Sequence, residues 1–292
     1  MAKDLSVSAV IPAYNEKGAI ADVVKGVREA LKRCAKTVEV VVVDDGSLDG
    51  TGEAAAAAGA TVVRHPVNRG YGAALRTGVN AAKHDWVLMT DADGSYPCAE
   101  IDKLFEGAPD FDLVIGARTG THFWGSPWSA LLRWIYLRVA SFIVGESLPD
   151  ANSGLRLVRR AALMNMGPVE CLGFSYSTTM TLSFLQAGRF VKFVPIAFSA
   201  RVGRSKVRKV RDMLRTLHLM TEVLIVYNPL KLFVVMAAAF ALPAAAALAL
   251  CVVSGNGVFL VLACFLALCA LLCFLFGCLL DALRMHLRTR PG

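Results

Sequence analysis

Short apolar runs alternate with amphipathic segments over the first 120 residues of the chain. The apolar runs lie at residues 7–11, 38–43, 61–64, 86–90 and 113–115. Runs of this length are typical of strands that are covered on both faces. From Ile20 to Leu31, apolar residues recur at helical spacing, and further helices are expected at 53–58 and 73–82. The alternation predicts an α/β fold in which helices wind a mostly parallel sheet.

Two much longer apolar runs follow near the C-terminal end. Residues 232–253 and 258–280 contain no charge, and Ser-Gly-Asn-Gly separates them. Each run exceeds the roughly 18 to 20 residues with which a helix crosses a bilayer core. Pro243 lies inside the first run, which membrane helices tolerate better than soluble helices do. We therefore predict a transmembrane hairpin over residues 230–281; two buried helices of a soluble core are the alternative.

The basic residues around this hairpin indicate its orientation. Lys231 precedes the first run, several arginines lie in the tail at 282–292, and the link between the runs has no basic residue. Cytoplasmic flanks are normally the basic ones. The N-terminal apolar stretch is also too short for a secretory signal. We expect a multi-pass protein of the cell (inner) membrane, with both termini and a catalytic domain at residues 1–200 in the cytoplasm.

The net charge of +8 is concentrated before the hairpin. Residues 201–215 hold seven Lys or Arg against one Asp. So close to a membrane hairpin, such a run favours contact with anionic lipid over contact with nucleic acid. We therefore expect no nucleic-acid partner, and we assign 201–229 to a basic loop followed by a juxtamembrane amphipathic helix.

Residues 126–144 form another amphipathic segment, too short and too polar to cross a membrane. Its Trp128 and Trp134, together with Arg133 and Arg138, are typical of a helix lying at the membrane interface. A core helix of the cytoplasmic domain would explain the same pattern, so both interpretations stay open.

Several common site classes lack their motifs. The chain has no G-x-G-x-x-G before a helix, no G-x-x-x-x-G-K and no G-x-S-x-G. None of its eight cysteines forms a C-x-x-C pair, and five of them lie in the apolar hairpin. These absences argue against a dinucleotide fold, a P-loop, a serine-hydrolase elbow, and a zinc or disulfide framework.

Polar residues follow each predicted strand, at the sheet edge where wound sheets bind ligands. The fourth strand runs directly into Asp91-Ala92-Asp93. Two carboxylates spaced in this way can hold one hard cation while phosphate oxygens complete its coordination. Shared-proton acid/base chemistry and simple turn capping are the alternatives.

The motifs around this pair resemble a known family. I-P-A-Y-N-E (11–16), V-V-V-D-D-G-S-L-D-G-T (41–51), N-R-G-Y-G-A-A-L-R-T-G (68–78) and D-A-D-G (91–94) are similar to family 2 glycosyltransferases, which have the GT-A fold. D-A-N-S-G-L-R-L (150–157), R-V-G-R-S-K (201–206) and the hairpin resemble the polyprenyl-phosphate branch. That branch includes dolichyl-phosphate mannose synthases and undecaprenyl-phosphate sugar transferases.

The resemblance implies a donor site for a nucleotide sugar and a divalent cation, Mg²⁺ or Mn²⁺. Asp93 matches the principal metal ligand, and Asp91 matches the acid nearer the nucleotide and sugar. The positions that match contacts to the base and ribose are Pro12, Tyr14, Glu16 and Asp44. The positions that match a loop closing over the donor diphosphate are Arg201, Ser205 and Lys206.

The resemblance also implies that Arg118 and Arg156, with Ser153 nearby, hold the phosphate of the acceptor lipid. An arginine fork can take two phosphate oxygens at once. One position departs from the pattern: much of the branch has a metal-contacting glutamine where this chain has Ser95. A metal contact by Ser95 is left open.

These features predict a metal-dependent, inverting hexosyltransferase that moves a sugar from a UDP- or GDP-sugar to undecaprenyl or dolichyl phosphate. Its partners would be the donor, the polyprenyl phosphate and the membrane. A membrane-anchored transferase acting on a glycan or protein, and a non-catalytic nucleotide-binding scaffold, are the alternatives. The sequence leaves open the sugar, the nucleotide, the polyprenyl chain, the downstream pathway and whether the protein is a homo-oligomer.

Overall fold

The computed structural model describes residues 4–106, 108–166, 175–199 and 209–288. The chain divides into two compact units, Met1–Met220 and Thr221–Gly292, and each is described by itself. The predicted loop residues Arg201, Ser205 and Lys206 lie outside the described residues. The predicted segment boundaries at 200, 229 and 281 stay predictions.

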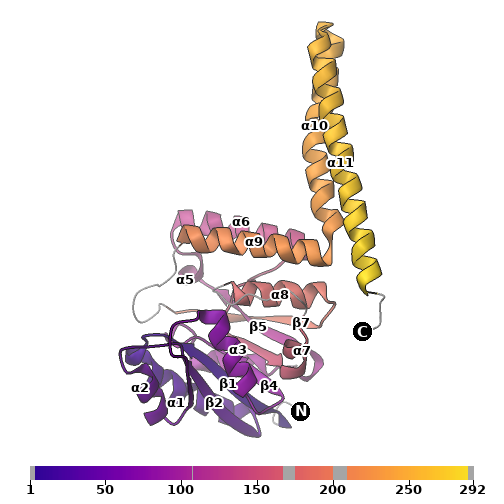
Figure 1. The fold of residues 1–292 in the computed structure, drawn as a ribbon. Coiled ribbons are helices and arrows are strands. Elements are labelled where there is room, and N and C mark those ends of the chain that lie inside the picture. Colours follow the sequence, from indigo (N-terminus) through magenta and orange to yellow (C-terminus); the bar gives the residue numbers. More distant parts are fainter. Residues whose placement is uncertain (1–3, 107, 167–174, 200–208, 289–292) are drawn as a thin grey trace. The chain divides into compact units, whose positions relative to one another are not determined.

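A seven-stranded sheet forms the centre of the first unit, in the order β3-β2-β1-β4-β6-β5-β7 (Figure 1). The strands are β1 (Ser6–Ala13), β2 (Thr37–Asp44), β3 (Thr61–Arg64), β4 (Trp86–Met89), β5 (Leu113–Thr119), β6 (Arg156–Arg159) and β7 (Val191–Ala197). Strand β6 is antiparallel to its neighbours β4 and β5, and the other pairs are parallel. The predicted α/β fold with a mostly parallel sheet is confirmed.

All five strands predicted from apolar runs are present, and β6 and β7 are additional. Strand β6 has only two apolar residues between its terminal arginines, so it carries no apolar run of its own. Strand β7 contains Pro195, which a strand accommodates at the edge of a sheet, where β7 lies.

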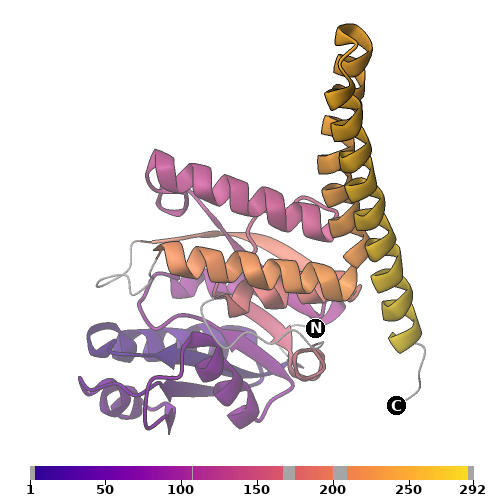
Figure 2. The same cartoon turned by 45° about the horizontal axis from the view of Figure 1, so that its top comes forward.

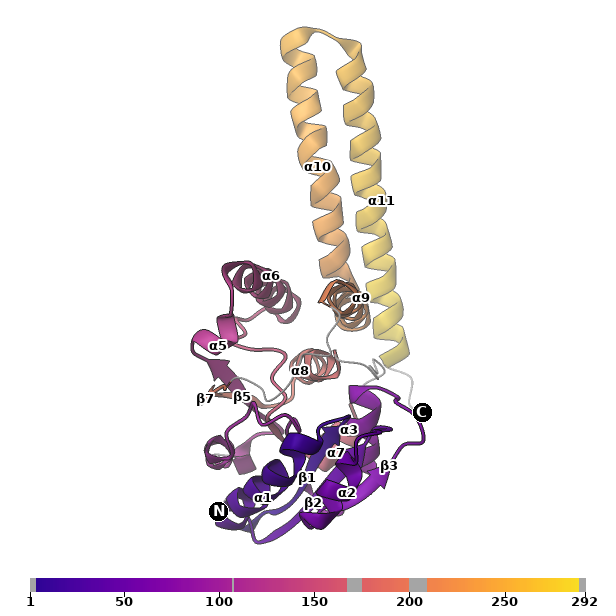
Figure 3. The same ribbon diagram turned by 90° about the vertical axis from the view of Figure 1, so that its left-hand side faces the viewer.

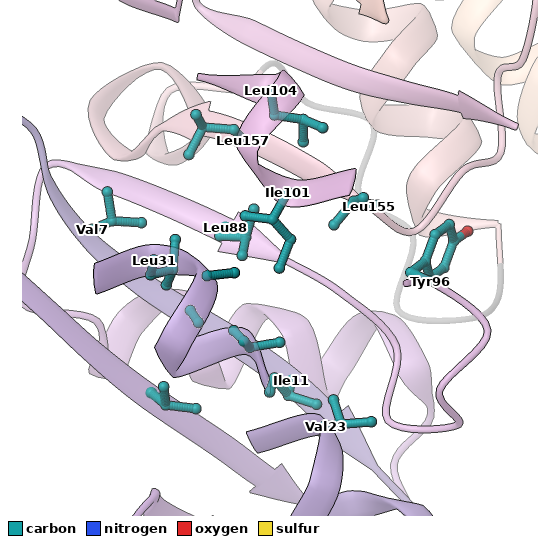
Figure 4. Packing of buried hydrophobic residues seen from close by; sticks show 14 of the residues in the cluster. Val7, Ile11, Val23, Leu31, Leu88, Tyr96, Ile101, Leu104, Leu155 and Leu157 are labelled. Atoms are coloured by element: carbon teal, nitrogen blue, oxygen red, sulfur yellow. The ribbon is translucent and has the colours of Figure 1, made fainter. Parts of the chain in front are cut away.

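Helices cover both faces of the sheet. Helix α1 (Lys17–Cys34) packs on the face that carries Ala9 and Ile11, as Figure 4 shows for part of this cluster. Helices α3 (Tyr71–Ala81) and α8 (Tyr176–Gln186) pack on the face of Val10. The two faces receive alternate residues because successive side chains of a strand point in opposite directions. Figure 3 shows α1 and α3 on opposite sides of β1. The shorter helices are α2 (Thr51–Ala57), α4 (Ile101–Leu104), α5 (Thr121–Trp124) and α7 (Arg160–Met164), with 3₁₀ turns at Cys98–Glu100 and Ala108–Asp110.

Helix α6 (Pro127–Val144) lies where the amphipathic segment was predicted. Pro127 occupies its first turn, and the side chain of Ser126 caps its N-terminus. Trp128 is 68% exposed and Trp134 is 53% exposed, whereas only two residues of the helix are buried. This exposure favours the interface helix over the core helix.

The second unit contains a helical hairpin of α10 (Pro229–Ser254) and α11 (Gly257–Arg288), which run side by side in Figures 1 and 2. Helix α9 (Lys209–Tyr227) precedes it. Both hairpin helices are long and apolar enough to cross a membrane. Gly277 allows close packing, since a Cβ there would lie 2.6 Å from Phe233 Cβ. The predicted hairpin is therefore confirmed as two apolar helices.

Candidate active site at one edge of the sheet

The loops that follow β1 and β2 are joined by hydrogen bonds. The Asn15 amide donates to Ser47 Oγ at 2.9 Å, and the Leu48 amide donates to Asn15 Oδ1 at 3.0 Å. Asp44, buried at the end of β2, accepts from the Ser47 amide at 3.0 Å. The residues predicted for the nucleotide lie at or just after these two strand ends: Pro12, Tyr14, Glu16 and Asp44. Their contact with a nucleotide stays a prediction.

Asp45 is buried and fixes a third loop beside them. Its Oδ1 accepts from the Arg69 amide at 2.9 Å, and its Oδ2 accepts from the Gly70 amide at 2.8 Å. His65 Nδ1 lies 2.6 Å from Asp45 Oδ1, and His65 Nε2 lies 2.9 Å from Thr77 Oγ1. Sequence analysis assigned no role to Asp45 or His65, because their contacts join residues that are far apart in the chain.

The acid pair follows β4, as predicted. Asp91 Oδ1 accepts a hydrogen bond from the Tyr71 hydroxyl at 2.9 Å. Burial, and next the charge of Asp91, raise the pKa of Tyr71 well above its ordinary value, so this hydroxyl keeps its proton. Asp93 is only 6% exposed, and its Oδ1 accepts from the Ser95 amide at 3.0 Å. The backbone of Ser95 thus orients Asp93, while a metal contact by its hydroxyl stays open.

The antiparallel direction of β6 brings a further loop to the same edge. Arg156 begins β6 and pairs with Met89 at the end of β4, so the residues just before β6 lie near the acid pair. In this loop, a Cβ at Gly154 would lie 2.8 Å from Asp91 Oδ1. The absence of a side chain at Gly154 therefore makes room for the Asp91 carboxylate.

Arg118, near the end of β5, forms an ion pair with the buried Asp150 of this loop. Arg118 Nε lies 2.7 Å from Asp150 Oδ2. Burial alone would lower the pKa of Arg118, but Tyr96 and Asp150 outweigh it and raise that pKa, so the guanidinium stays charged. The guanidinium also stacks on Phe123, with its carbon 5.2 Å from the ring centroid.

Arg133 of α6 stacks on the same ring, 4.4 Å from the centroid. Its Nη1 is buried and has no hydrogen-bond partner among the residues that the structure describes. Burial, and next the charge of Arg118, lower the pKa of Arg133. Sequence analysis placed Arg133 only in an amphipathic helix. The charge of Arg133 within a mostly apolar stretch was the feature of the sequence that could have indicated a functional role. Its position beside Arg118 on the Phe123 ring is a tertiary contact, which the sequence does not show.

Arg156 and Ser153 lie deeper than Arg118. Arg156 is 1% exposed, and its Nε and Nη2 donate to the carbonyls of Ser153 and Ala151 at 2.6 and 3.1 Å. Burial lowers the pKa of Arg156, although nearby groups, Tyr71 first, oppose this effect. The predicted contact of Arg156 and Ser153 with a lipid phosphate stays a prediction.

The acid pair suits a hard divalent cation. Asp91 and Asp93 offer carboxylate oxygens, the donors that Mg²⁺ prefers, and Mg²⁺ commonly takes one or two carboxylates together with substrate phosphates. Among the described residues, no group of three or more His, Cys, Asp or Glu could hold a metal ion by itself. The residues present therefore fit a cation that is shared with a diphosphate substrate.

Comparison with known proteins places the chain among sugar transferases. It is 29% identical to an undecaprenyl-phosphate mannosyltransferase from Micrococcus luteus, over 70% of this chain and 88% of that protein. It is 32% identical to a dolichyl-phosphate hexose transferase from Haloferax volcanii, over 70% of this chain and 86% of that protein. It spans about half, 51%, of the low-salt glycan biosynthesis hexosyltransferase Agl6 from the same species, at 29% identity.

The fold is shared with glucosyl-3-phosphoglycerate synthase from Mycobacterium tuberculosis. A crystal structure of that protein with Mg²⁺ and uridine diphosphate matches with a TM-score of 0.62 at 20% identity, over 75% of this chain and 79% of the other. A complex of the same protein contains Mn²⁺, uridine diphosphate and glucosyl-3-phosphoglycerate. The predicted GT-A fold is confirmed.

The family model described as glycosyl transferase family 2 matches residues 8–167, more than half of the chain. The matched segment includes the acid pair, the joined loops after β1 and β2, and the loop with Asp150. The chain therefore belongs to glycosyl transferase family 2.

Proposed function

We propose that this protein transfers a sugar from a nucleoside-diphosphate donor to a polyprenyl phosphate at a membrane. The observation that carries the proposal is the meeting, at one sheet edge, of the acid pair after β4 with Arg118, through the loop that contains Asp150 and Gly154. The match with this chain covers most of the length of two relatives. These relatives are named as an undecaprenyl-phosphate mannosyltransferase and a dolichyl-phosphate hexose transferase.

The donor occupies the first half of the edge. Pro12, Tyr14, Glu16 and Asp44 would hold the base and ribose. Asp93 and Asp91 would hold Mg²⁺ or Mn²⁺ against the diphosphate, with Asp93 as the principal ligand. The bound cation would supply Lewis-acid stabilisation of the charge on the leaving diphosphate. Arg201, Ser205 and Lys206, which lie outside the described residues, would close over the diphosphate.

The acceptor phosphate occupies the second half, beside Arg118 and Arg133. Arg118 and Arg133 both stack on the ring of Phe123, and Arg118 already has a carboxylate partner in Asp150. A phosphate would add negative charge beside Arg133 and would give its buried Nη1 a partner. Arg156 and Ser153 are assigned to the same phosphate by the resemblance, and Arg156 Nη1 is likewise buried with no hydrogen-bond partner among the described residues.

The reaction needs no side-chain base. A lipid monophosphate is already ionised near neutral pH, so its oxygen attacks the anomeric carbon directly. The bond from that carbon to the donor diphosphate breaks, and the electron pair leaves with the nucleoside diphosphate. Arg118, oriented by Asp150, aligns the attacking oxygen, and this alignment lowers the entropic cost of the step. Attack opposite the leaving group inverts the anomeric centre.

The hairpin would anchor the enzyme beside its lipid acceptor. The basic flanks of the hairpin support an orientation with the catalytic unit and both termini in the cytoplasm. The exposed apolar side chains of α6 suit contact with the membrane interface.

A donor screen tests the proposal. Full-length protein in proteoliposomes would receive radiolabelled UDP-glucose, UDP-N-acetylglucosamine or GDP-mannose with Mg²⁺ or Mn²⁺, and undecaprenyl or dolichyl phosphate. Label in an organic-phase lipid with one donor is the expected result. Label in a protein or glycan instead would support the alternative acceptor class. Nucleotide binding with no turnover of any donor would support a scaffold.

A further inference from the structure

The carboxylate of Asp91 is confined by two residues that have no part in the proposed chemistry. The Tyr71 hydroxyl donates to Oδ1 at 2.9 Å. Gly154 also lies beside the carboxylate, and a Cβ there would be 2.8 Å from Oδ1 and 2.9 Å from Oδ2. A carboxylate bounded in this way has little freedom to rotate.

Tyr71 is itself held in place by its helix. It is the first residue of α3, directly after the two amides, of Arg69 and Gly70, that donate to the buried Asp45 carboxylate. Negative charge at a helix N-terminus is stabilising, so Asp45 fixes where α3 begins.

The middle of α3 is fixed as well. Gly78 lies so close to Val10 and Val43 of the sheet that a Cβ would overlap the Val10 side chain. With its N-terminus and its middle both fixed against the sheet, α3 presents the Tyr71 hydroxyl at a defined position.

We infer that Tyr71 is a positioning residue that holds the Asp91 carboxylate in the orientation required by the divalent cation and the donor diphosphate. The inference rests on the proposed function, because the cation and diphosphate belong to that proposal. Groups that orient metal-binding carboxylates typically change metal affinity by about 10–100-fold when they are removed. Tyr71 thus supplies Asp91 with a hydrogen bond that orients it, as the Ser95 amide does for Asp93.

Direct Mn²⁺ binding to the full-length protein with UDP, measured by electron paramagnetic resonance, tests this role. Tyr71→Phe removes the hydroxyl and keeps the ring that packs on the core, so Mn²⁺ affinity should fall about tenfold or more. The melting temperature should change little, and excess Mn²⁺ should restore UDP binding. Tyr136→Phe is the matched control, because it removes a tyrosine hydroxyl that bonds Thr178 Oγ1 at 2.7 Å and should leave Mn²⁺ affinity unchanged.

Gly154→Ala provides a second route to Asp91, since the added Cβ would displace the carboxylate while Tyr71 stays intact; it should also weaken Mn²⁺ binding. One outcome would separate the two claims: the parent binds Mn²⁺, Asp93→Ala abolishes this binding, and Tyr71→Phe leaves it unchanged. The role of Tyr71 is then wrong, and the metal site stands. If the parent binds Mn²⁺ neither with UDP nor with GDP, the metal site and the role of Tyr71 are both overturned.

Discussion

Arg118 and Asp150 form a bidentate ion pair, in which Arg118 Nε and Nη2 donate to the two carboxylate oxygens at 2.7 and 3.0 Å. Asp150 also accepts from the Asn152 amide at 3.0 Å, so the carboxylate is fixed within its own loop. The pair therefore ties the direction of the Arg118 guanidinium to the loop that borders the acid pair.

Asp150→Asn should weaken use of the lipid acceptor. The amide keeps the shape of the side chain but loses the charge and one acceptor oxygen, and bonds to charged groups contribute about 1.5–3 kcal/mol. We expect the apparent KM for polyprenyl phosphate to rise roughly tenfold or more. Transfer kinetics at varied lipid concentration would measure it. Hydrolysis of the donor without lipid is the internal control and should persist; an unchanged KM would contradict the assignment of Arg118.

Arg156→Lys separates two roles for a buried arginine. Lysine keeps the charge but cannot donate to the carbonyls of Ser153 and Ala151 together as the guanidinium does. Because Arg156 is proposed to hold the acceptor phosphate, we expect lipid use to fall while donor hydrolysis persists. Both are measured by following UDP or GDP release with and without lipid. A parallel loss of donor hydrolysis and lipid use would instead indicate that Arg156 only supports the loop that borders Asp91 and Arg118.

Asp93→Ala should abolish sugar transfer, because it removes the principal proposed metal ligand. Radiolabel recovered in lipid measures the loss, which we expect to exceed 100-fold if the cation is essential, equal to about 2.7 kcal/mol or more in transition-state stabilisation. The melting temperature of the variant should stay close to that of the parent, which serves as the folding control. Transfer near the parental rate would refute the metal assignment.

Trp128 of α6 should lie within reach of lipid in proteoliposomes. Trp128 is 68% exposed, whereas Trp86 in the sheet is 4% exposed. In variants that retain a single tryptophan, brominated lipid should quench the fluorescence of Trp128 and spare that of Trp86. Equal fluorescence of both variants with and without bromine would mean that α6 does not meet the membrane.

Local patterns predicted much of the fold. The apolar runs located the first five strands and the hairpin, because each depends on residues that are neighbours in the chain. Strand β6 has no such run; it is defined by pairing with β4 and β5 on either side. Its direction, which brings the Asp150 loop to the active edge, is a property of the assembled sheet.

The candidate site divides in the same way. Asp91 and Asp93 were found because their spacing is local. Their supports come from distant segments: Tyr71 is 20 residues from Asp91 in sequence, and Asp150 is 32 residues from Arg118. Tyr71 and Asp150 lie in motifs that the sequence shows, but their contacts with Asp91 and Arg118 are visible only in the folded structure.

The single antiparallel strand has a consequence for how this enzyme could diversify. Strand β6 lies between two groups of strands. On one side are β3-β2-β1-β4, in which the ends of β1, β2 and β4 carry the proposed donor residues; on the other side are β5 and β7, and Arg118 lies on β5. Substitutions in the second group could change the acceptor while nucleotide chemistry is retained. Evolution could thus change the preference for the donor or for the acceptor separately. The loop that contains Asp150 borders both proposed sites, so its sequence must stay compatible with each of them.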